Sequence, residues 1–242
     1  MKKLSAIIIL IFFTGCTNNK TTAIEKMSEV DYNKYLNKKT IENTPIEVVN
    51  LGKLYLPSGE IVACDPLANP ESKPFSRKVF PGIYNVKIYI AKTEKSGNRV
   101  AFAKLEFNNK KAIKWVLATI DGDDISKLKK DEYLGFGVDA GVGSFFDYQS
   151  GIAYNKFLEN FYKQNDSLNI YDDLLAKEFK KNAKNPNDQK DTGDWVNFKI
   201  PNENLNVIMF QSGYGDGVYP AYWGLANDNL PTCLIIDFLI FN

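Results

Sequence analysis

The chain has 242 residues, and its 30 lysines and arginines against 29 aspartates and glutamates give a formal net charge of +1. Because there is no basic excess to hold a phosphate backbone, nucleic acid is not an expected partner. The sequence contains no histidine, which excludes Ser-His-Asp and Cys-His nucleophile activation and histidine-rich zinc sites. Any catalysis would have to use carboxylates, lysine, tyrosine, cysteine or backbone groups, and no cofactor is expected.

The N-terminus has the three parts of an export signal. Two lysines precede an apolar run at residues 6–13, and Thr-Gly stands directly before Cys16. The run is too short to cross the hydrocarbon core of a bilayer, which takes about 20 helical residues. Residues 13–16 resemble the lipobox of bacterial lipoproteins. This resemblance predicts a lipoprotein signal peptide over residues 1–15 and a diacylated Cys16. The alternative is an incidental cysteine within a signal segment.

The predicted lipid anchor implies a location. Two or three acyl chains on one residue hold a protein stably at a bilayer, so a lipid bilayer is the expected partner of Cys16. The residues that follow are polar, and we assign residues 16–45 to the lipidated cysteine and a flexible tether. Thr17, in place of aspartate, favours an outer-membrane or cell-surface location by resemblance to Gram-negative lipoproteins. In a Gram-positive cell the same signal implies the outer face of the membrane.

From residue 46 onward the sequence predicts short strands. Pro-Ser-Gly at 57–59 indicates a turn, and the alternating apolar residues at 84–90 are typical of a half-buried strand. The short polar connection at 108–111 predicts an antiparallel hairpin, because a parallel crossover needs a dozen or more residues. The strands expected in this half are 46–56, 60–64, 84–90, 100–107 and 112–119.

The middle of the chain is predicted to be helical. Residues 149–162 and 170–179 place apolar side chains near one face at helical spacing. Strands are then expected at 195–200, 206–211, 218–223 and 233–241. The last of these is apolar on both faces apart from Asp237, as a central strand would be. We therefore predict one α+β domain over residues 46–242, mainly antiparallel β-sheet with a helical insertion around 149–182.

Two cysteines follow Cys16 in the sequence. Outside the cytoplasm, Cys64 and Cys233 are candidates for one disulfide that closes a long loop and stabilises the fold by about 4–5 kcal/mol. Both also lie in apolar, strand-like runs. Two buried thiols are therefore the alternative.

Carboxylates in two glycine-rich segments, 135–147 and 212–224, are the candidate catalytic residues. These are Asp139, Asp147 and Asp216. Glycine lets a backbone approach a ligand closely, and carboxylates on such loops can bind a hard cation or act as acid and base. The alternative is that the aspartates accept backbone N–H bonds in tight turns, with Asp147 as the N-cap of the following helix.

Several motifs of the domain resemble a single family. They are residues 56–67, 81–86, 100–103, Trp115, 137–147, 212–220, 222–224 and 237–238. Over about residues 46–242 the chain resembles a domain of unknown function, number 4241, that is found mainly in bacteria. The resemblance implies a domain boundary and no particular activity.

The residues are compatible with three functions. A surface-anchored binding module is favoured, because aromatic residues near glycine turns suit recognition of a protein or glycan. The candidate binding residues are Tyr219, Trp223, Asp65 and Asp237. A carboxylate-based hydrolase, with or without a metal ion, requires Asp139, Asp147 and Asp216 to meet in one cleft. An immunity-like partner of a toxin is the third hypothesis.

Overall fold

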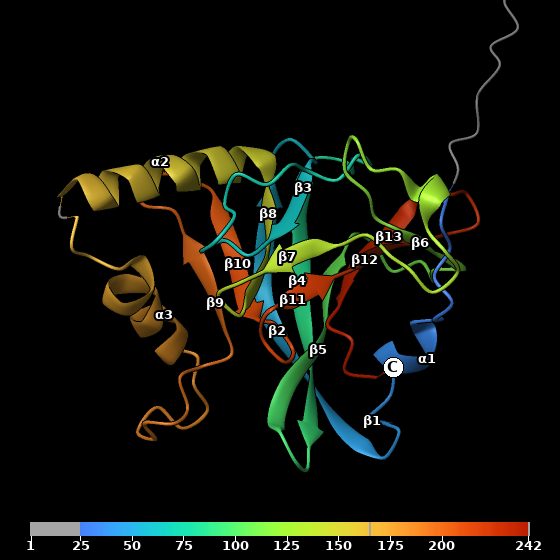
Figure 1. The fold of residues 1–242 in the computed structure, drawn as a ribbon, viewed down its shortest axis with the longest axis horizontal. Coiled ribbons are helices and arrows are strands. Elements are labelled where there is room, and N and C mark those ends of the chain that lie inside the picture. The colour runs from blue at the N-terminus through green and yellow to red at the C-terminus, as the bar shows by residue number, and fades with distance from the viewer. Residues whose placement is uncertain (1–24, 165, 242) are drawn as a thin grey trace, which may run out of the picture.

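The computed structural model describes residues 25–164 and 166–241, with two antiparallel sheets at its centre (Figure 1). The larger sheet has, in spatial order, β1 (Thr40–Ile41), β2 (Thr44–Leu56), β4 (Gly82–Thr93), β5 (Gly97–Glu106), β13 (Pro231–Asp237), β12 (Ala221–Leu225) and β6 (Lys114–Leu117). The smaller sheet has β3 (Ile61–Cys64), β8 (Val142–Asp147), β10 (Asn206–Gln211) and β9 (Trp195–Lys199), and a separate ribbon pairs β11 (Gly217–Tyr219) with β7 (Phe136–Val138).

Helices occupy a small part of the fold. They are α1 (Asn33–Leu36), α2 (Tyr148–Gln164) and α3 (Ala176–Lys180), with a 3₁₀ turn at Ile125–Lys127 and a π-helical turn at Ile170–Leu175 before α3. All strand pairs of the described sheets are antiparallel. The predicted α+β class with mainly antiparallel sheet is therefore confirmed.

One predicted strand pairing is wrong. The expected hairpin between 100–107 and 112–119 does not form, because β13 and β12 lie between β5 and β6 in the sheet. The apolar strand β13 is buried from Thr232 to Asp237 and pairs with β5 and β12. A strand that is apolar on both faces buries most apolar surface when other strands lie on both of its edges and other elements cover both of its faces. This long-range pairing therefore displaces the local hairpin.

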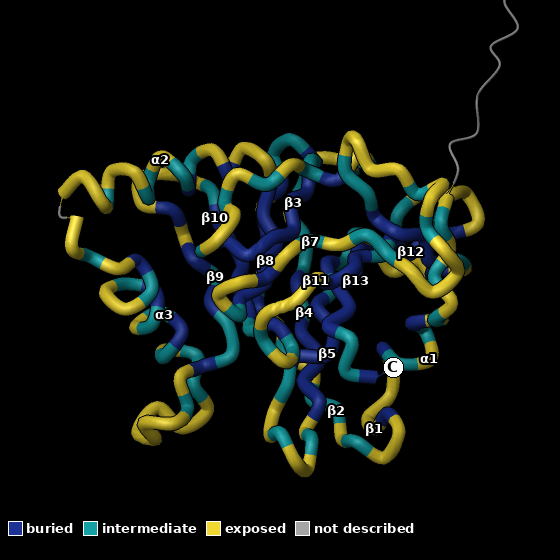
Figure 2. The backbone as a smooth tube through the Cα atoms, viewed as in Figure 1, coloured by how far each residue is buried: buried dark blue, intermediate teal, exposed yellow. Residues whose placement is uncertain are grey.

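Buried side chains form three layers, and Figure 2 colours the buried residues dark blue along the backbone. The central layer fills the space between the two sheets and includes Leu54, Phe145 and Trp223. A second layer lies between the smaller sheet and the helices, where Tyr154 of α2 and Phe179 of α3 are buried. The helical insertion predicted around 149–182 thus covers the outer face of the smaller sheet.

The third layer lies under residues 25–43, which we call the N-terminal strap. The strap begins beside β6, where the Ser28 amide donates to the Trp115 carbonyl (2.9 Å) and the Leu117 amide to the Lys26 carbonyl (2.8 Å). It then crosses the outer face of the larger sheet to β1. Its side chain Tyr32 is only 1% exposed. The strap therefore covers both the edge strand β6 and one sheet face.

The expected tether over residues 16–45 is wrong for its second part. From residue 25 onward this segment is folded against the domain, and its own side chains Tyr32, Leu36 and Ile41 are buried. The predicted signal peptide, residues 1–15, and the predicted lipid-bearing Cys16 lie outside the described residues. Within the described part of the chain, no helix is long and apolar enough to cross a membrane.

The two remaining cysteines are free thiols. Cys64 is buried between the smaller sheet and the helices, whereas Cys233 is buried on the outer face of the larger sheet. The disulfide between them is therefore a wrong prediction, and the alternative of two buried thiols describes the structure. Burial raises the pKa of the Cys64 thiol to about 12, so this side chain is an inert thiol at neutral pH.

Candidate functional site

Asp65 is a buried structural carboxylate that joins two loops. Its Oδ1 accepts the backbone N–H groups of Leu67 (3.0 Å) and Ala68 (3.3 Å). Its Oδ2 accepts those of Asp139 (3.0 Å) and Ala140 (2.6 Å). The side chain is fully buried. Both oxygens are thus used to hold the loop after β3 against the loop after β7.

Asp147 also has a structural environment. It ends β8 and is fully buried, and it accepts hydrogen bonds from the backbone and hydroxyl of Ser58 and from the Gln149 amide (2.9 Å). The bond from Gln149, at the start of α2, is the N-cap arrangement that the sequence allowed as an alternative. Asp147 therefore caps α2 and fixes the turn at Ser58.

Asp139 and Asp216 lie together, away from Asp147. The ribbon register puts Val138 opposite Gly217, so Asp139 and Asp216 are the residues that continue the two strands beyond the ribbon end. Both are exposed. Asp147, by contrast, is fully buried at the end of β8, where its carboxylate accepts bonds from Ser58 and Gln149. The three carboxylates therefore share no cleft, and among the described residues no group of three or more acidic or cysteine side chains could hold a metal ion.

Tyr219 and Trp223 belong to the core and not to a recognition surface. Trp223 is 2% exposed and packs against the rings of Phe75 and Phe107 at centroid distances of 6.2 and 5.9 Å. Tyr219 is 6% exposed and donates its hydroxyl to the Gly215 carbonyl (2.9 Å). The expectation that these two aromatic residues contact a ligand is therefore wrong, because their rings are covered.

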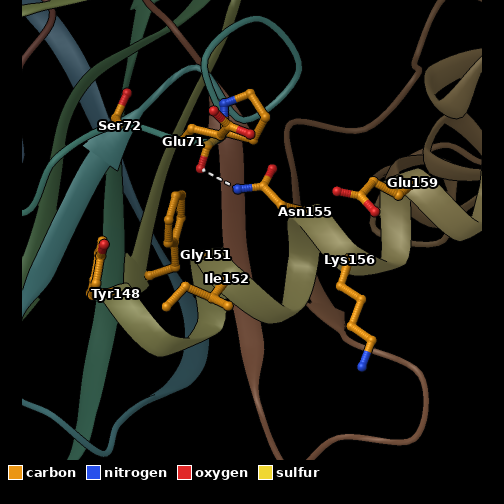
Figure 3. A pocket seen from close by; sticks show the side chains of 10 residues that line it. Glu71, Ser72, Tyr148, Gly151, Ile152, Asn155, Lys156 and Glu159 are labelled. Atoms are coloured by element: carbon orange, nitrogen blue, oxygen red, sulfur yellow. Dashed lines mark hydrogen bonds between the residues drawn. The ribbon is translucent and has the colours of Figure 1, made fainter.

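A wide groove runs along the first half of α2 (Figure 3). It has a volume of about 620 Å³ and lies between the helix and the loop after β3. Asn155 donates to the Pro70 carbonyl at 3.3 Å, but Lys156 points away from that contact and Glu159 lies further along the helix. Because its polar groups diverge, this groove offers no common point at which a ligand group would be held.

A smaller pocket contains the last candidate, Asp237. It has a volume of about 230 Å³ and lies between the N-terminal strap and the end of β13. The Tyr32 hydroxyl donates to Asp237 Oδ2 at 2.7 Å, and the Leu239 amide donates to Oδ1 at 2.8 Å. Tyr222 and Tyr133 contribute further aromatic wall, and the Tyr32 and Tyr222 rings lie 5.4 Å apart. Polar groups from distant segments thus converge on one carboxylate, and we call this the Asp237 pocket.

The electrostatics of the Asp237 pocket are unusual for a folded domain. Asp237 is 4% exposed and has no ion pair among the described residues. Burial raises its pKa to about 6, against the opposing effect of the hydrogen bonds from Tyr32 and Leu239. Burial, and then the neighbouring Asp237, raise the pKa of Tyr222 to about 12. At neutral pH the pocket therefore holds a buried anion beside neutral phenols.

Sequence reasoning found Asp237 but missed the rest of this pocket. Asp237 stood out as the only polar residue in an apolar run. Tyr32 was missed because the strap has too few apolar residues to show a helical or strand period. Tyr222 was noted only as one of several aromatic residues near glycine turns. No local pattern connects these residues, because Tyr32 lies 205 residues before Asp237 and Tyr222 lies on the neighbouring strand β12.

The raised pKa of Asp237 predicts how the stability of the protein depends on pH. The ordinary value is 3.8 and the folded value is about 6, so the folded state binds the proton more tightly and stability falls as pH rises between these values. Asp237→Asn keeps partners for Tyr32 and Leu239 but cannot ionise. The free energy of unfolding is measured for both proteins by urea denaturation at about pH 4 and about pH 7.5. We expect the stability of the variant relative to the wild type to be about 2 kcal/mol higher at the upper pH than at the lower one. If the two proteins differed in free energy of unfolding by the same amount at both pH values, a raised pKa of Asp237 would be contradicted.

Fold and site together define an α+β protein of two facing antiparallel sheets with a small acidic pocket at the strap. The chain belongs to the family described as protein of unknown function (DUF4241), whose model matches residues 54–236. This confirms the family predicted from the motifs. The match leaves out the strap and stops one residue before Asp237. No curated protein and no solved structure matches the chain.

Proposed function

We propose that this protein is a binding module whose ligand-binding site is the Asp237 pocket. The ligand is a compact organic cation, an ammonium or guanidinium group. The observation that carries the proposal is a buried carboxylate with no cationic partner in the described chain. Buried carboxylates are normally paired with a cation or fully hydrogen-bonded. Asp237 receives two hydrogen bonds, whereas Asp65 receives four from backbone amides.

The remaining walls of the pocket fit the same ligand. Each carboxylate oxygen of Asp237 has accepted one hydrogen bond and has capacity for another. The ring of Tyr222, which is only partly buried and lines the pocket, offers cation–π contact. Two lysines and four carboxylates line the pocket. Both lysines are engaged, since Lys26 donates to backbone carbonyls and Lys130 pairs with Glu29. A net negative pocket favours a positive ligand.

The pocket volume limits the size of the ligand. Sites for whole drug-sized molecules usually enclose about 300–1,000 Å³, and this one has about 230 Å³. It therefore takes a single cationic group, either a small amine or the end of a lysine or arginine side chain of a protein partner. A protein partner of this kind is compatible with the interaction role expected from the sequence.

The proposal is tested by titrating the protein with Nα-acetyl-lysine methylamide at about pH 7.5 and following backbone amide shifts by NMR. The neutral norleucine analogue is the matched ligand control. We expect saturable shifts at Tyr222 and Leu239 with the lysine probe only, and at least about tenfold weaker binding by Asp237→Asn. The matched control variant is Asp216→Asn, an exposed carboxylate, which should bind as the wild type does. Equal binding of both probes, or full binding by Asp237→Asn, would overturn the proposal.

The pH dependence of binding gives a second readout of the same site. Protonation of Asp237 removes the anion, and its pKa is about 6. Because the cationic ligand favours the ionised form, affinity should fall as pH drops through the pKa. The lysine probe is expected to bind about tenfold more weakly at about pH 5 than at about pH 7.5. A flat profile would remove Asp237 from the site.

We also propose that the binding domain is held outside the cytoplasm by acyl chains on Cys16. Support comes from the signal-like residues 1–15 and the lipobox-like residues 13–16. The full-length protein should incorporate an alkyne analogue of palmitate and partition into the detergent phase of Triton X-114. Cys16→Ser should lose both properties, and Cys233→Ser, a buried thiol, should keep them. A wild-type protein that takes up no label would overturn the anchor and leave the Asp237 pocket unaffected.

A further inference from the structure

Another pocket lies beside Phe75, between β3 of the smaller sheet and the residues that follow β6 of the larger sheet. Its volume is about 200 Å³, and its lining comes from β3 and the loop that follows it, from β7 and β12, and from the residues that follow β6. Phe75 joins the two sheets at this point, since its amide donates to the Ile61 carbonyl (2.8 Å) and it forms a bridge with Ile120. The pocket shares no lining residue with the Asp237 pocket. The two pockets are therefore distinct, although Ala118 and Ala221 of this one adjoin Leu117 and Tyr222 of the other.

The floor of this pocket is made of small buried residues. Ala63, Ala118 and Ala221 are each no more than 6% exposed and line it from three different strands or strand ends. Phe75 and Phe136 form aromatic wall. Protein interiors seldom leave apolar space of this size unfilled. An engineered apolar cavity of about 150 Å³ takes up benzene, so the volume suits one six-membered ring.

The rim of the pocket carries hydrogen-bond donors. Lys73 is exposed, and its ammonium lies 3.5 Å from the Asp121 carbonyl, which is long for a hydrogen bond. Asn69 is also exposed at this rim. The rim also carries the carboxylate of Asp123, whose Oδ2 accepts the Ile120 amide at 2.8 Å, so Lys73 and Asp123 are its two charged residues. A ligand with an anionic group at the rim would replace water on the Lys73 ammonium.

We infer that this pocket is a second ligand-binding site, which takes a small apolar ring bearing a carboxylate. The ring lies on the alanine floor between Phe75 and Phe136, and the carboxylate meets Lys73 at the rim. The ligand is opposite in charge to the one proposed for the Asp237 pocket. The two sites therefore select different molecules, and failure of either proposal leaves the other standing.

The test uses benzoate as the probe and the amide shifts of Ala118 and Gly137 as the readout. We expect saturable shifts in the wild type and at least about tenfold weaker binding by Ala221→Leu, whose larger side chain fills the floor. Lys73→Gln, at an exposed position, should weaken benzoate binding and leave the binding of neutral benzyl alcohol unchanged. Lys163→Gln, on α2, is the matched control and should bind as the wild type does.

Three results would overturn this inference. They are the lack of any benzoate shift in the wild type, wild-type affinity in a folded Ala221→Leu protein, and wild-type affinity in Lys73→Gln. The last decides the question even where Ala221→Leu fails to fold, because the Lys73 side chain lies at the surface. Circular dichroism of each variant establishes that it is folded before its affinity is measured.

Discussion

Replacing Asp65 by alanine is expected to lower the free energy of unfolding by about 3–5 kcal/mol. The substitution leaves four backbone N–H groups without their acceptor: those of Leu67, Ala68, Asp139 and Ala140. Asparagine should rescue little, because its amide group would face two of these donors. Urea unfolding followed by tryptophan fluorescence measures the effect.

Asp139→Ala is the matched control for Asp65. Asp139 contributes its backbone amide to this network while its side chain is exposed. Its removal should change stability by no more than about 0.5 kcal/mol. If Asp65→Ala proved as stable as the wild type, the loop-anchoring role of the carboxylate would be contradicted.

Trp223→Ala is expected to destabilise the fold by a similar amount, about 3–5 kcal/mol. The side chain is 2% exposed and lies between the two sheets against Phe75 and Phe107. Its removal takes away apolar burial and leaves a cavity that the surrounding strands cannot close. Thermal and urea unfolding measure the loss, with the intact protein as reference.

Tyr214→Ala is the control for Trp223, because it belongs to the same glycine-rich segment but is 60% exposed. Its substitution should leave stability within about 0.5 kcal/mol of the wild type. A stable Trp223→Ala protein would contradict the placement of Trp223 in the core. It would return this residue to the recognition role that the sequence first suggested.

Local sequence patterns predicted the positions of helices and strands better than they predicted which strands pair. The alternation at 84–90 lies within β4, and the helical spacing at 149–162 lies within α2. Strand pairing was less accessible, because it depends on contacts between residues far apart in the chain. Nothing near residues 108–111 reveals that β12 and β13, more than a hundred residues later, separate β5 from β6.

The candidate carboxylates illustrate the same limit for sites. Their residue types and glycine-rich surroundings were visible in the sequence, but their roles depend on what donates to them. Asp65 and Asp147 are used up by backbone and serine donors, whereas Asp237 has fewer donors and faces a pocket. The donors to these carboxylates include groups of the N-terminal strap and of the loops after β3 and β7. These segments come together only in the folded chain.

The sequence by itself determined the α+β class, the family, the apolar central strand and the lack of histidine chemistry, because these follow from composition, spacing and local motifs. Only the tertiary structure decided the strand order, the burial of Trp223 and Tyr219, the free state of Cys64 and Cys233, and the pocket around Asp237. These properties depend on which distant surfaces exclude water together. Such burial is a property of the assembled sheets and not of any single segment.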